Sequence, residues 1–342
     1  MNSKLFNKIT KKFNYGVSTV KIGKKIIKIL FISIAIVLIF IGITYINHKL
    51  QLKKENVLFK PLGQVVEVNG NKMSIYVEGE GDKTLIFMSG GGTSSPILDF
   101  KSLYSKLRDD YKVVVIEKFG YGFSDIVDEK RTIQTILNES REALKKANIE
   151  GPYILCPHSM SGIEALYWAQ QYPQEIKAII GLDMAVPKAY SDYSINMPLI
   201  KISSFASHIG ITRFLPGISE SEAIKYGTLT QEEKEIYKAV FYRRTATKTM
   251  INEVKEIKNN ALIVDRGNVV DIPILIFCSN GNGTGWNKEE WRKFQDDYIN
   301  RSKRGKLISL DCSHYVHDHD YKKIAENMKS FIIEINKLYD LT

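Results

Sequence analysis

Ser159 has the sequence surroundings of a serine that attacks a carbonyl carbon. An apolar run over residues 153–156 precedes it, and a helix-like stretch over residues 163–171 follows it. A serine on the sharp turn between a buried strand and a helix is typical of a nucleophile elbow, which usually reads G-x-S-x-G. Here Pro157 and Ser161 occupy the two glycine positions, so the match is degenerate. Because a hydroxyl is a weak nucleophile, the hypothesis also requires a base within hydrogen-bond reach.

The elements that would position Ser159 alternate between short apolar strands and helices. An N-G-N turn at residues 69–71, between two apolar runs, predicts a hairpin. Beyond it, strands that alternate with helices predict right-handed crossovers and a mostly parallel sheet. The alternation stops over residues 187–270, and this helix-rich segment is expected to form a cap over the carboxyl ends of the strands. The predicted strands cover 64–68, 73–78, 83–88, 111–116, 153–156, 176–182, 273–277 and 305–310, and the predicted helices cover 98–107, 132–147, 163–171, 231–258, 288–299 and 321–338.

Four motifs in chain order resemble those of the α/β-hydrolase superfamily, over roughly residues 60–340. The resemblance is greatest to the capped branch of lipases, esterases and proline iminopeptidases. It implies an eight-stranded, mostly parallel sheet with flanking helices and a helical cap. The motifs are S-G-G-G at 89–92, which resembles the oxyanion loop; E-K-F-G-Y-G-F-S at 117–124, which resembles D-x-x-G-x-G-x-S; H-S-M-S-G at 158–162, which resembles H-S-M-G-G; and D-C-S-H at 311–314, which resembles the histidine loop before the last helix.

The resemblance also implies a base and an acid for Ser159. His314 follows a predicted strand by the expected short loop and is the predicted base, with His317 as the alternative. The family usually places the acid in the loop that here covers residues 278–285. That loop contains no carboxylate, and Asn282 stands where the aspartate is expected. Asp183 follows a neighbouring strand, as the acid does in pancreatic-type lipases, so we hypothesise that Asp183 is the acid.

The remaining site residues follow from the same resemblance. The backbone N–H groups of Gly91 and Met160 would form the oxyanion hole, where donors stabilise the tetrahedral intermediate. Gly90 is the alternative donor and a possible substrate contact. Glu164, five residues after Ser159, stands where the family usually has a small or apolar residue. It is a second possible substrate contact, for instance for an amine, or part of a buried network. It could equally form an ion pair with Arg243 or Arg244, or face solvent.

The site chemistry requires no metal and no cofactor. The nearest approach to metal-ligand spacing is the H-x-x-H-D-H run at residues 314–319, for which we expect no zinc. The three cysteines argue against a disulfide framework.

The N-terminal segment predicts a membrane anchor. Residues 29–46 contain no charged residue, and eighteen residues at about 1.5 Å each reach about 27 Å, close to the thickness of a bilayer's hydrocarbon core. Residues 1–28 carry eight lysines and no acid, whereas residues 47–60 carry four lysines and one glutamate. The charge difference predicts a cytoplasmic N-terminus and an extracytoplasmic domain in the cell membrane. A cleaved signal peptide is the alternative. Before the span, apolar residues at helical spacing allow either an amphipathic helix or a solvated tail.

The predicted organisation is a basic cytoplasmic tail (1–28), a transmembrane helix (29–46), a linker (47–62), a hydrolase core (63–186 and 271–342) and a helical cap (187–270). The net charge of +10 comes from the tail and linker, because residues 61–342 carry a net charge of −1. Nucleic-acid binding is therefore not expected.

Taken together, the sequence predicts a membrane-anchored serine hydrolase that cleaves a carboxylic ester or a related acyl bond. Its expected substrate is a small ester, a lipid or a short peptide. Two alternatives stay open: an aminopeptidase or amidase of the proline-iminopeptidase type, and an inactive hydrolase-fold binding protein.

Overall fold

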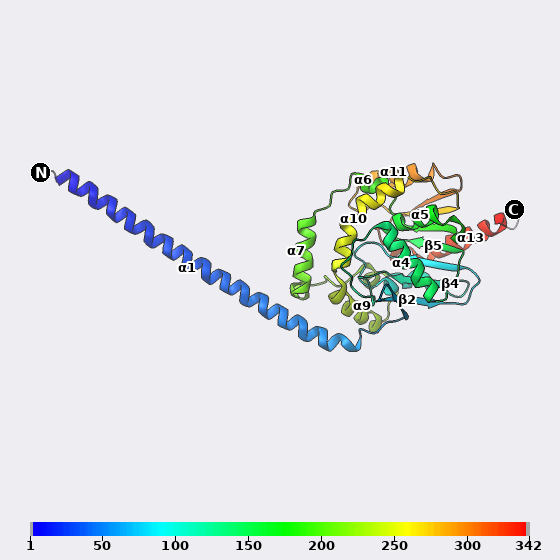
Figure 1. Ribbon diagram of the computed structural model, residues 1–342, viewed down its shortest axis with the longest axis horizontal. Coiled ribbons are helices and arrows are strands. Elements are labelled where there is room, and N and C mark those ends of the chain that lie inside the picture. Colours follow the sequence, from blue (N-terminus) through cyan, green and yellow to red (C-terminus); the bar gives the residue numbers. More distant parts are fainter. Residues whose placement is uncertain (1–2, 340–342) are drawn as a thin grey trace.

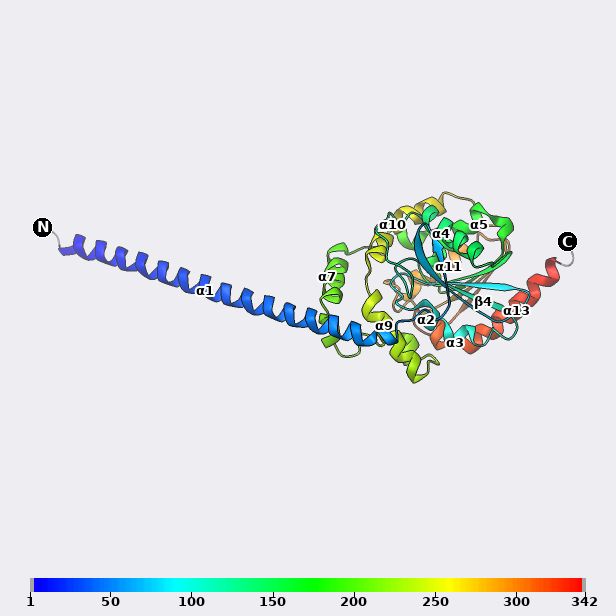
Figure 2. The ribbon, with the colours of Figure 1, turned by 60° about the horizontal axis from the view of Figure 1, so that its bottom comes forward.

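The chain begins with one long helix, α1, which spans Ser3–Lys54 and is followed by the short helix η1 at Glu55–Val57. The computed structural model describes the backbone of residues 3–339 and the side chains of residues 24–337, so the side-chain pattern of the tail lies outside it. Figures 1 and 2 show α1 extending away from the globular part, and its C-terminal end packs against η3 and α9. Residues Lys24–Val57, from α1 into η1, form a candidate membrane span whose apolar window is not buried in the protein. Residues 3–28 of the tail and much of the predicted linker are therefore helical.

Eight strands form one mixed sheet in the order β1-β2-β4-β3-β5-β6-β7-β8. β1 pairs antiparallel with β2, and β2 pairs antiparallel with β4, whereas the other neighbours are parallel. Asn69 and Gly70 have φ values of 50° and 74°, the left-handed conformation that a tight hairpin turn requires. The predicted eight-stranded, mostly parallel sheet is confirmed. The strands are β1 Gln64–Val68, β2 Asn71–Glu78, β3 Thr84–Met88, β4 Lys112–Glu117, β5 Tyr153–Pro157, β6 Ile176–Leu182, β7 Ile274–Cys278 and β8 Gly305–Ser309.

Helices cover both faces of this sheet, as Figure 2 shows. Every residue of β3, β5 and β7 is buried, because parallel strands between two helical layers have no solvent-facing side. One apolar cluster joins the sheet to α4 and α5, and a second joins its other face to α3 and α13. The helices of these two layers are α2 Pro96–Asp99, α3 Lys101–Tyr104, α4 Ile133–Lys146, α5 Ser161–Gln171, α11 Lys288–Ile299, α12 Val316–His319 and α13 Tyr321–Tyr339, with the short η2 at Pro173–Glu175.

The segment between β6 and β7 is helical, as its sequence predicts. It contains α6 Lys188–Ser191, α7 Met197–His208, η3 Ile211–Phe214, α8 Glu222–Lys225, α9 Gln231–Arg244 and α10 Lys248–Asp265. Its treatment as a separate cap domain stays a prediction.

Two predicted helices are divided in the structure. The one expected over residues 231–258 breaks between α9 and α10, where Ala246 has a φ of 50° and the Thr247 hydroxyl caps α10 by accepting a hydrogen bond from the N–H of Met250. The one expected over residues 98–107 forms the short helices α2 and α3.

Candidate active site

Ser159 lies on the turn between β5 and α5, with a φ of 53°. Positive φ is uncommon for a residue with a side chain and marks the strained turn of a nucleophile elbow. The substitution of serine for glycine at position 161 has a structural explanation. The Ser161 hydroxyl is fully buried and lies within hydrogen-bond distance of the carbonyls of Met88 (2.7 Å) and His158 (2.8 Å). The next residue, Gly162, is the one that needs to be glycine, since a Cβ there would lie 2.2 Å from the carbonyl oxygen of Ala185.

His314 connects Ser159 to Asp183. Its Nε2 lies 2.7 Å from Ser159 Oγ, and its Nδ1 lies 2.5 Å from Asp183 Oδ2. The histidine sits in the loop after β8, where its backbone N–H donates to the carbonyl of Asn282 at 2.9 Å. The three residues predicted from sequence as nucleophile, base and acid are therefore in one hydrogen-bonded line.

Asp183 is fully buried, immediately after β6, and also has a positive φ, of 50°. Its second oxygen, Oδ1, accepts hydrogen bonds from the Ser279 N–H (2.7 Å) and from the indole N–H of Trp291 (2.8 Å). The loop after β7, which lacks a carboxylate, thus contributes a backbone donor to an acid that comes from the neighbouring strand. Ser279 and Trp291 stand in no recognisable motif of the sequence. The pairing of β6 with β7 brings Ser279 near Asp183, whereas Trp291 reaches it from α11.

A second histidine, His158, packs beside the first. Their ring centroids are 4.5 Å apart, and His158 Nε2 lies 3.1 Å from the carbonyl oxygen of His314. Burial, together with His314 and His317, holds the pKa of His158 well below its usual range. A neutral His158 that donates through Nε2 would fix the backbone of His314.

The glycine loop after β3 packs directly on the elbow. A Cβ on Gly90 would lie 2.7 Å from Cβ of Ser159, so this position requires glycine. A Cβ on Gly91 would meet the flexible end of the Met160 side chain at 3.0 Å. Gly91 and Met160 both line the cavity next to Ser159, whereas Gly90 is not among its lining residues. Their role as oxyanion donors stays a prediction.

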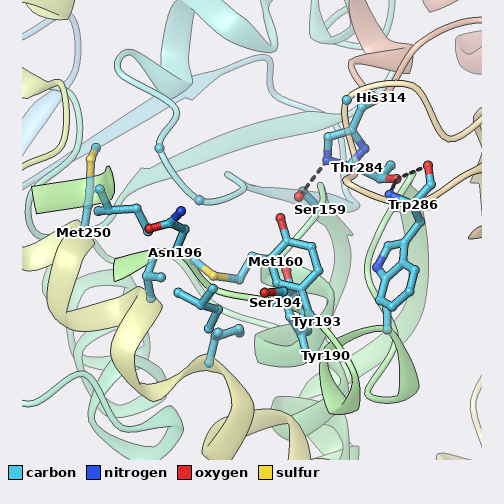
Figure 3. Close-up of a pocket in the computed structure, with 18 of the residues that line it drawn as sticks. Ser159, Met160, Tyr190, Tyr193, Ser194, Asn196, Met250, Thr284, Trp286 and His314 are labelled. Carbon is cyan, nitrogen blue, oxygen red and sulfur yellow. Dashed lines mark hydrogen bonds between the residues drawn. The ribbon is translucent and has the colours of Figure 1, made fainter. Parts of the chain in front are cut away.

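A cavity of about 610 Å³ opens over Ser159. Figure 3 shows Ser159 and His314 at one end of the cavity and Met250 and Asn196 at the other. Tyr190 and Tyr193 are drawn below Ser159 in this view. More than half of the lining residues come from the segment between β6 and β7, and most of these are apolar or aromatic. None of the described residues that line it is an aspartate, glutamate, lysine or arginine.

Glu164 is not part of this cavity wall. It is buried, and its carboxylate accepts from Lys118 Nζ at 2.6 Å. The same Lys118 donates to Glu253 on α10 at 2.6 Å. Of the roles considered for Glu164, the buried network is the one the structure forms. Its partner is neither Arg243 nor Arg244, because Arg243 bonds to Leu52 and Asn56, and Arg244 bonds to the carbonyl of Gly122.

The H-x-x-H-D-H run does not form one ligand set. His314 faces Ser159, His317 contacts Asp99 at 3.2 Å, and His319 contacts Glu222 at 2.8 Å. Among the described residues, one buried group has the composition and spacing of metal ligands, namely Asp99, His317 and Asp318.

Comparison with known proteins places this geometry in a family. Residues 83–207 match the model of the alpha/beta hydrolase fold. An uncharacterized protein of Bacillus subtilis, YbdG, is 41% identical over 258 residues, which cover 74% of this chain and 79% of that protein. The chain belongs to the α/β-hydrolase family. This membership supports a hydrolase activity.

Solved structures share the fold of this α/β-hydrolase. The enol-lactonase of Burkholderia xenovorans superposes with a TM-score of 0.60 at 13% identity, over 79% of this chain and all of that one. A haloalkane dehalogenase from Bradyrhizobium elkanii superposes with a TM-score of 0.58 at 15% identity, over 81% and 98% of the two chains. At such low identities these structures show the fold and leave the reaction to the residues of the site.

Proposed function

We propose that this α/β-hydrolase is a serine hydrolase that cleaves a carboxylic ester or a related acyl bond. The observation that carries the proposal is the line of contacts from Ser159 through His314 to Asp183, at the end of an apolar cavity. The positive φ of Ser159 supports it, because strained nucleophile turns present the hydroxyl to the substrate.

The proposed mechanism uses the same three residues in both half-reactions. His314 Nε2 takes the proton of Ser159 as Oγ attacks the carbonyl carbon, and Asp183 stabilises the imidazolium through Nδ1. The N–H groups of Gly91 and Met160 hold the oxyanion of the tetrahedral intermediate. Collapse breaks the bond to the leaving alcohol, which takes the proton from His314. A water molecule then repeats the sequence on the acyl-enzyme, releases the acid and regenerates Ser159.

The cavity wall favours a neutral acyl group over an aminoacyl group. An aminopeptidase needs a carboxylate near the substrate's ammonium, and the described wall residues contain none. The sequence offers Glu164 as a carboxylate that could bind a substrate amine, but its carboxylate is paired with Lys118. An ester with an apolar acyl chain is therefore the substrate class that we propose.

Fluorophosphonate labelling of the full chain in detergent tests the nucleophile. We expect the wild type to be labelled, Ser159→Ala to be unlabelled, and Ser194→Ala, a matched change in the cavity wall, to retain labelling. A folded wild type that resists the label would instead favour an inactive binding protein. A panel of acyl esters of increasing chain length and of aminoacyl amides then separates esterase from aminopeptidase activity.

We further propose that α1 anchors the enzyme in the cell membrane with the lysine-rich end in the cytoplasm and the globular part outside. The exposed apolar side chains of α1 and the excess of lysine before the span support this topology. An anchored chain should resist alkaline extraction from membranes and keep its N-terminal residues. A mature protein that begins after residue 46 would show a cleaved signal sequence instead.

A further inference from the structure

In the helix α7 large apolar side chains face outward and serines face the protein, which is the reverse of an ordinary surface helix. A surface helix normally turns its apolar stripe toward the core. In α7 the large apolar side chains Leu199, Ile202 and Phe205 are 57%, 64% and 57% exposed. These residues are spaced three apart and share one face of the helix. The buried positions are instead Ser204 and Ser207.

The exposed apolar surface continues beyond α7 into the next turn. Phe214, Leu215 and Ile218 are also exposed. Between residues 197 and 218 the sequence contains no aspartate or glutamate. We call this surface, made of Leu199, Ile202, Phe205, Phe214, Leu215 and Ile218, the α7 face. Several large apolar side chains exposed within one short segment favour contact with a membrane or another protein.

The position of the α7 face is fixed by contacts with α1. A Cβ on Gly210 would lie 2.4 Å from Cβ of His48 and 3.0 Å from the carbonyl oxygen of Thr44, so the two backbones touch. Arg213 holds Glu55 with two hydrogen bonds, of 2.7 and 2.8 Å, and donates a third to His48. Because Thr44 lies near the C-terminal end of the uncharged stretch of α1, residues 29–46, the turn after α7 lies beside the end of that stretch.

The helix α7 lies on the side of the globular part from which α1 comes. Figures 1 and 2 both show α7 at the edge of the globular part that faces the N-terminal end of α1, whereas α13 lies at the opposite edge. A membrane crossed by α1 would therefore lie against α7. The exposed Lys201 on α7 would then meet the headgroup layer, where lysine is favoured beside anionic lipids.

The same helix forms part of the wall above Ser159. Asn196, Leu199 and Ile200 line the cavity that contains Ser159 and His314. Leu199 is therefore both a cavity residue and the first residue of the α7 face. It connects the exposed apolar residues of α7 with the wall of the site.

We propose that the α7 face is inserted in the interfacial layer of the lipid bilayer, and that the substrate is an amphipathic acyl lipid that reaches Ser159 from the bilayer past α7. The first part rests on the proposed anchoring by α1, and the second part rests on the proposed hydrolase activity, whose substrate class it names. A helix with one apolar face and a lysine at its border is suited to lie in the plane of the interface.

The insertion is tested with the full chain in vesicles of phosphatidylcholine and phosphatidylglycerol. An environment-sensitive fluorophore is attached at Ile202→Cys, in a Cys312→Ser background because Cys312 is the partly exposed native cysteine. The matched control carries it at Ile333→Cys on α13, which is similarly exposed (54%) on the far side. We expect the label at position 202 to shift to the blue and to be quenched by lipids that carry a quencher, and the label at 333 to do neither.

If the label at position 202 shows neither a blue shift nor quenching by the lipids, the proposal is overturned. A blue shift that vanishes when the protein is diluted in excess lipid would also overturn it, because that outcome assigns the α7 face to a second copy of the chain.

The route of the substrate is tested by rates. The double variant Ile202→Ser/Phe205→Ser is expected to hydrolyse a long-chain ester embedded in vesicles about fivefold or more slowly than the wild type, and a water-soluble short-chain ester at the wild-type rate. Equal losses on both substrates would overturn the route. If the wild type hydrolyses neither ester and resists the fluorophosphonate, the proposed function fails together with the route, while the fluorescence still decides the insertion.

Discussion

Asp183 and His314 meet across the ends of two strands that are not neighbours in the sheet. The acid follows β6, the histidine follows β8, and Asp183 Oδ2 lies 2.5 Å from Nδ1 of His314. The intervening strand, β7, contributes the Ser279 N–H, which holds the other oxygen of the same carboxylate. The carboxylate of Asp183 can therefore stabilise a protonated His314, although the loop after β7 contains Asn282 and no carboxylate.

Removing the charge of Asp183 should abolish most turnover with little change in shape. In Asp183→Asn, the amide oxygen could still accept from Ser279 and Trp291, but the imidazolium would lose its counter-charge and the histidine its preferred tautomer. We expect kcat on an acyl ester to fall by about four orders of magnitude. Asn282→Ala is the matched control and should retain most activity, because the contact of Asn282 with His314 uses its backbone carbonyl. Near-normal turnover in Asp183→Asn would contradict the assignment of the acid.

The two glycines beside Ser159 should differ in their tolerance of a side chain. In Gly90→Ala, the new Cβ would lie 2.7 Å from Cβ of Ser159 and 3.0 Å from Nδ1 of His158, so the elbow or the loop would have to move. In Gly91→Ala, the new Cβ would meet the flexible end of Met160 at 3.0 Å. We therefore expect Gly90→Ala to lose far more activity than Gly91→Ala, measured as kcat/KM on a soluble ester.

Circular dichroism of both glycine variants serves as the control for folding. Comparable losses in two folded variants would show that the close approach of Gly90 to Ser159 does not matter for the reaction.

The sequence predicts those parts of this site that depend on order along the chain. Ser159 and His314 could be placed because each follows a short apolar run at a recognisable motif. Asp183 could be proposed because the carboxyl ends of neighbouring parallel strands meet at one edge of a sheet. The eight strands follow from the same local patterns of apolar residues.

Contacts between distant segments could not be predicted in this way. Lys118 and Glu164 are 46 residues apart, and nothing in their local patterns pairs them. The break after α9 depends on a capping threonine, Thr247, inside a stretch whose composition favours one continuous helix. The contact of Gly210 with α1 likewise depends on tertiary packing, and so does the exposure of the apolar side chains of α7.

The buried ion triad of Lys118, Glu164 and Glu253 should contribute strongly to stability as long as it is complete. It joins the loop after β4 to α5 and to α10, and all three side chains are nearly inaccessible to water. Lys118→Met would leave two carboxylates buried without their cation. We expect a loss of about 3–5 kcal/mol in the free energy of unfolding, measured by denaturant titration of the detergent-solubilised chain.

The neutral triple variant Lys118→Met/Glu164→Gln/Glu253→Gln is the comparison for this loss. It removes both carboxylates as well, so it should recover a large part of the stability lost in Lys118→Met. Equal stability of the single variant and the wild type would show that the triad contributes nothing to folding.

Glu117 should make the protein less stable as the pH rises toward neutrality. Its side chain is fully buried, and burial raises its pKa from 4.5 to about 7, although the Phe123 N–H donates to one oxygen at 2.9 Å. A Cβ on Gly122 would lie 1.9 Å from the other oxygen, so the carboxyl is enclosed by backbone. The folded protein therefore retains a proton that the unfolded chain releases near pH 4.5.

Since the folded state binds more protons in this interval, the free energy of unfolding falls as the pH rises. The stability that Glu117 contributes is fully present below pH 4.5 and is lost as the pH passes through about 7. A shift of this size corresponds to about 3 kcal/mol. Glu117→Gln keeps an acceptor for Phe123 and cannot ionise, so its loss of stability between pH 5 and pH 8 should be smaller than that of the wild type. Thermal unfolding of both proteins at a series of pH values measures the difference, and parallel profiles would show that Glu117 does not titrate in this range.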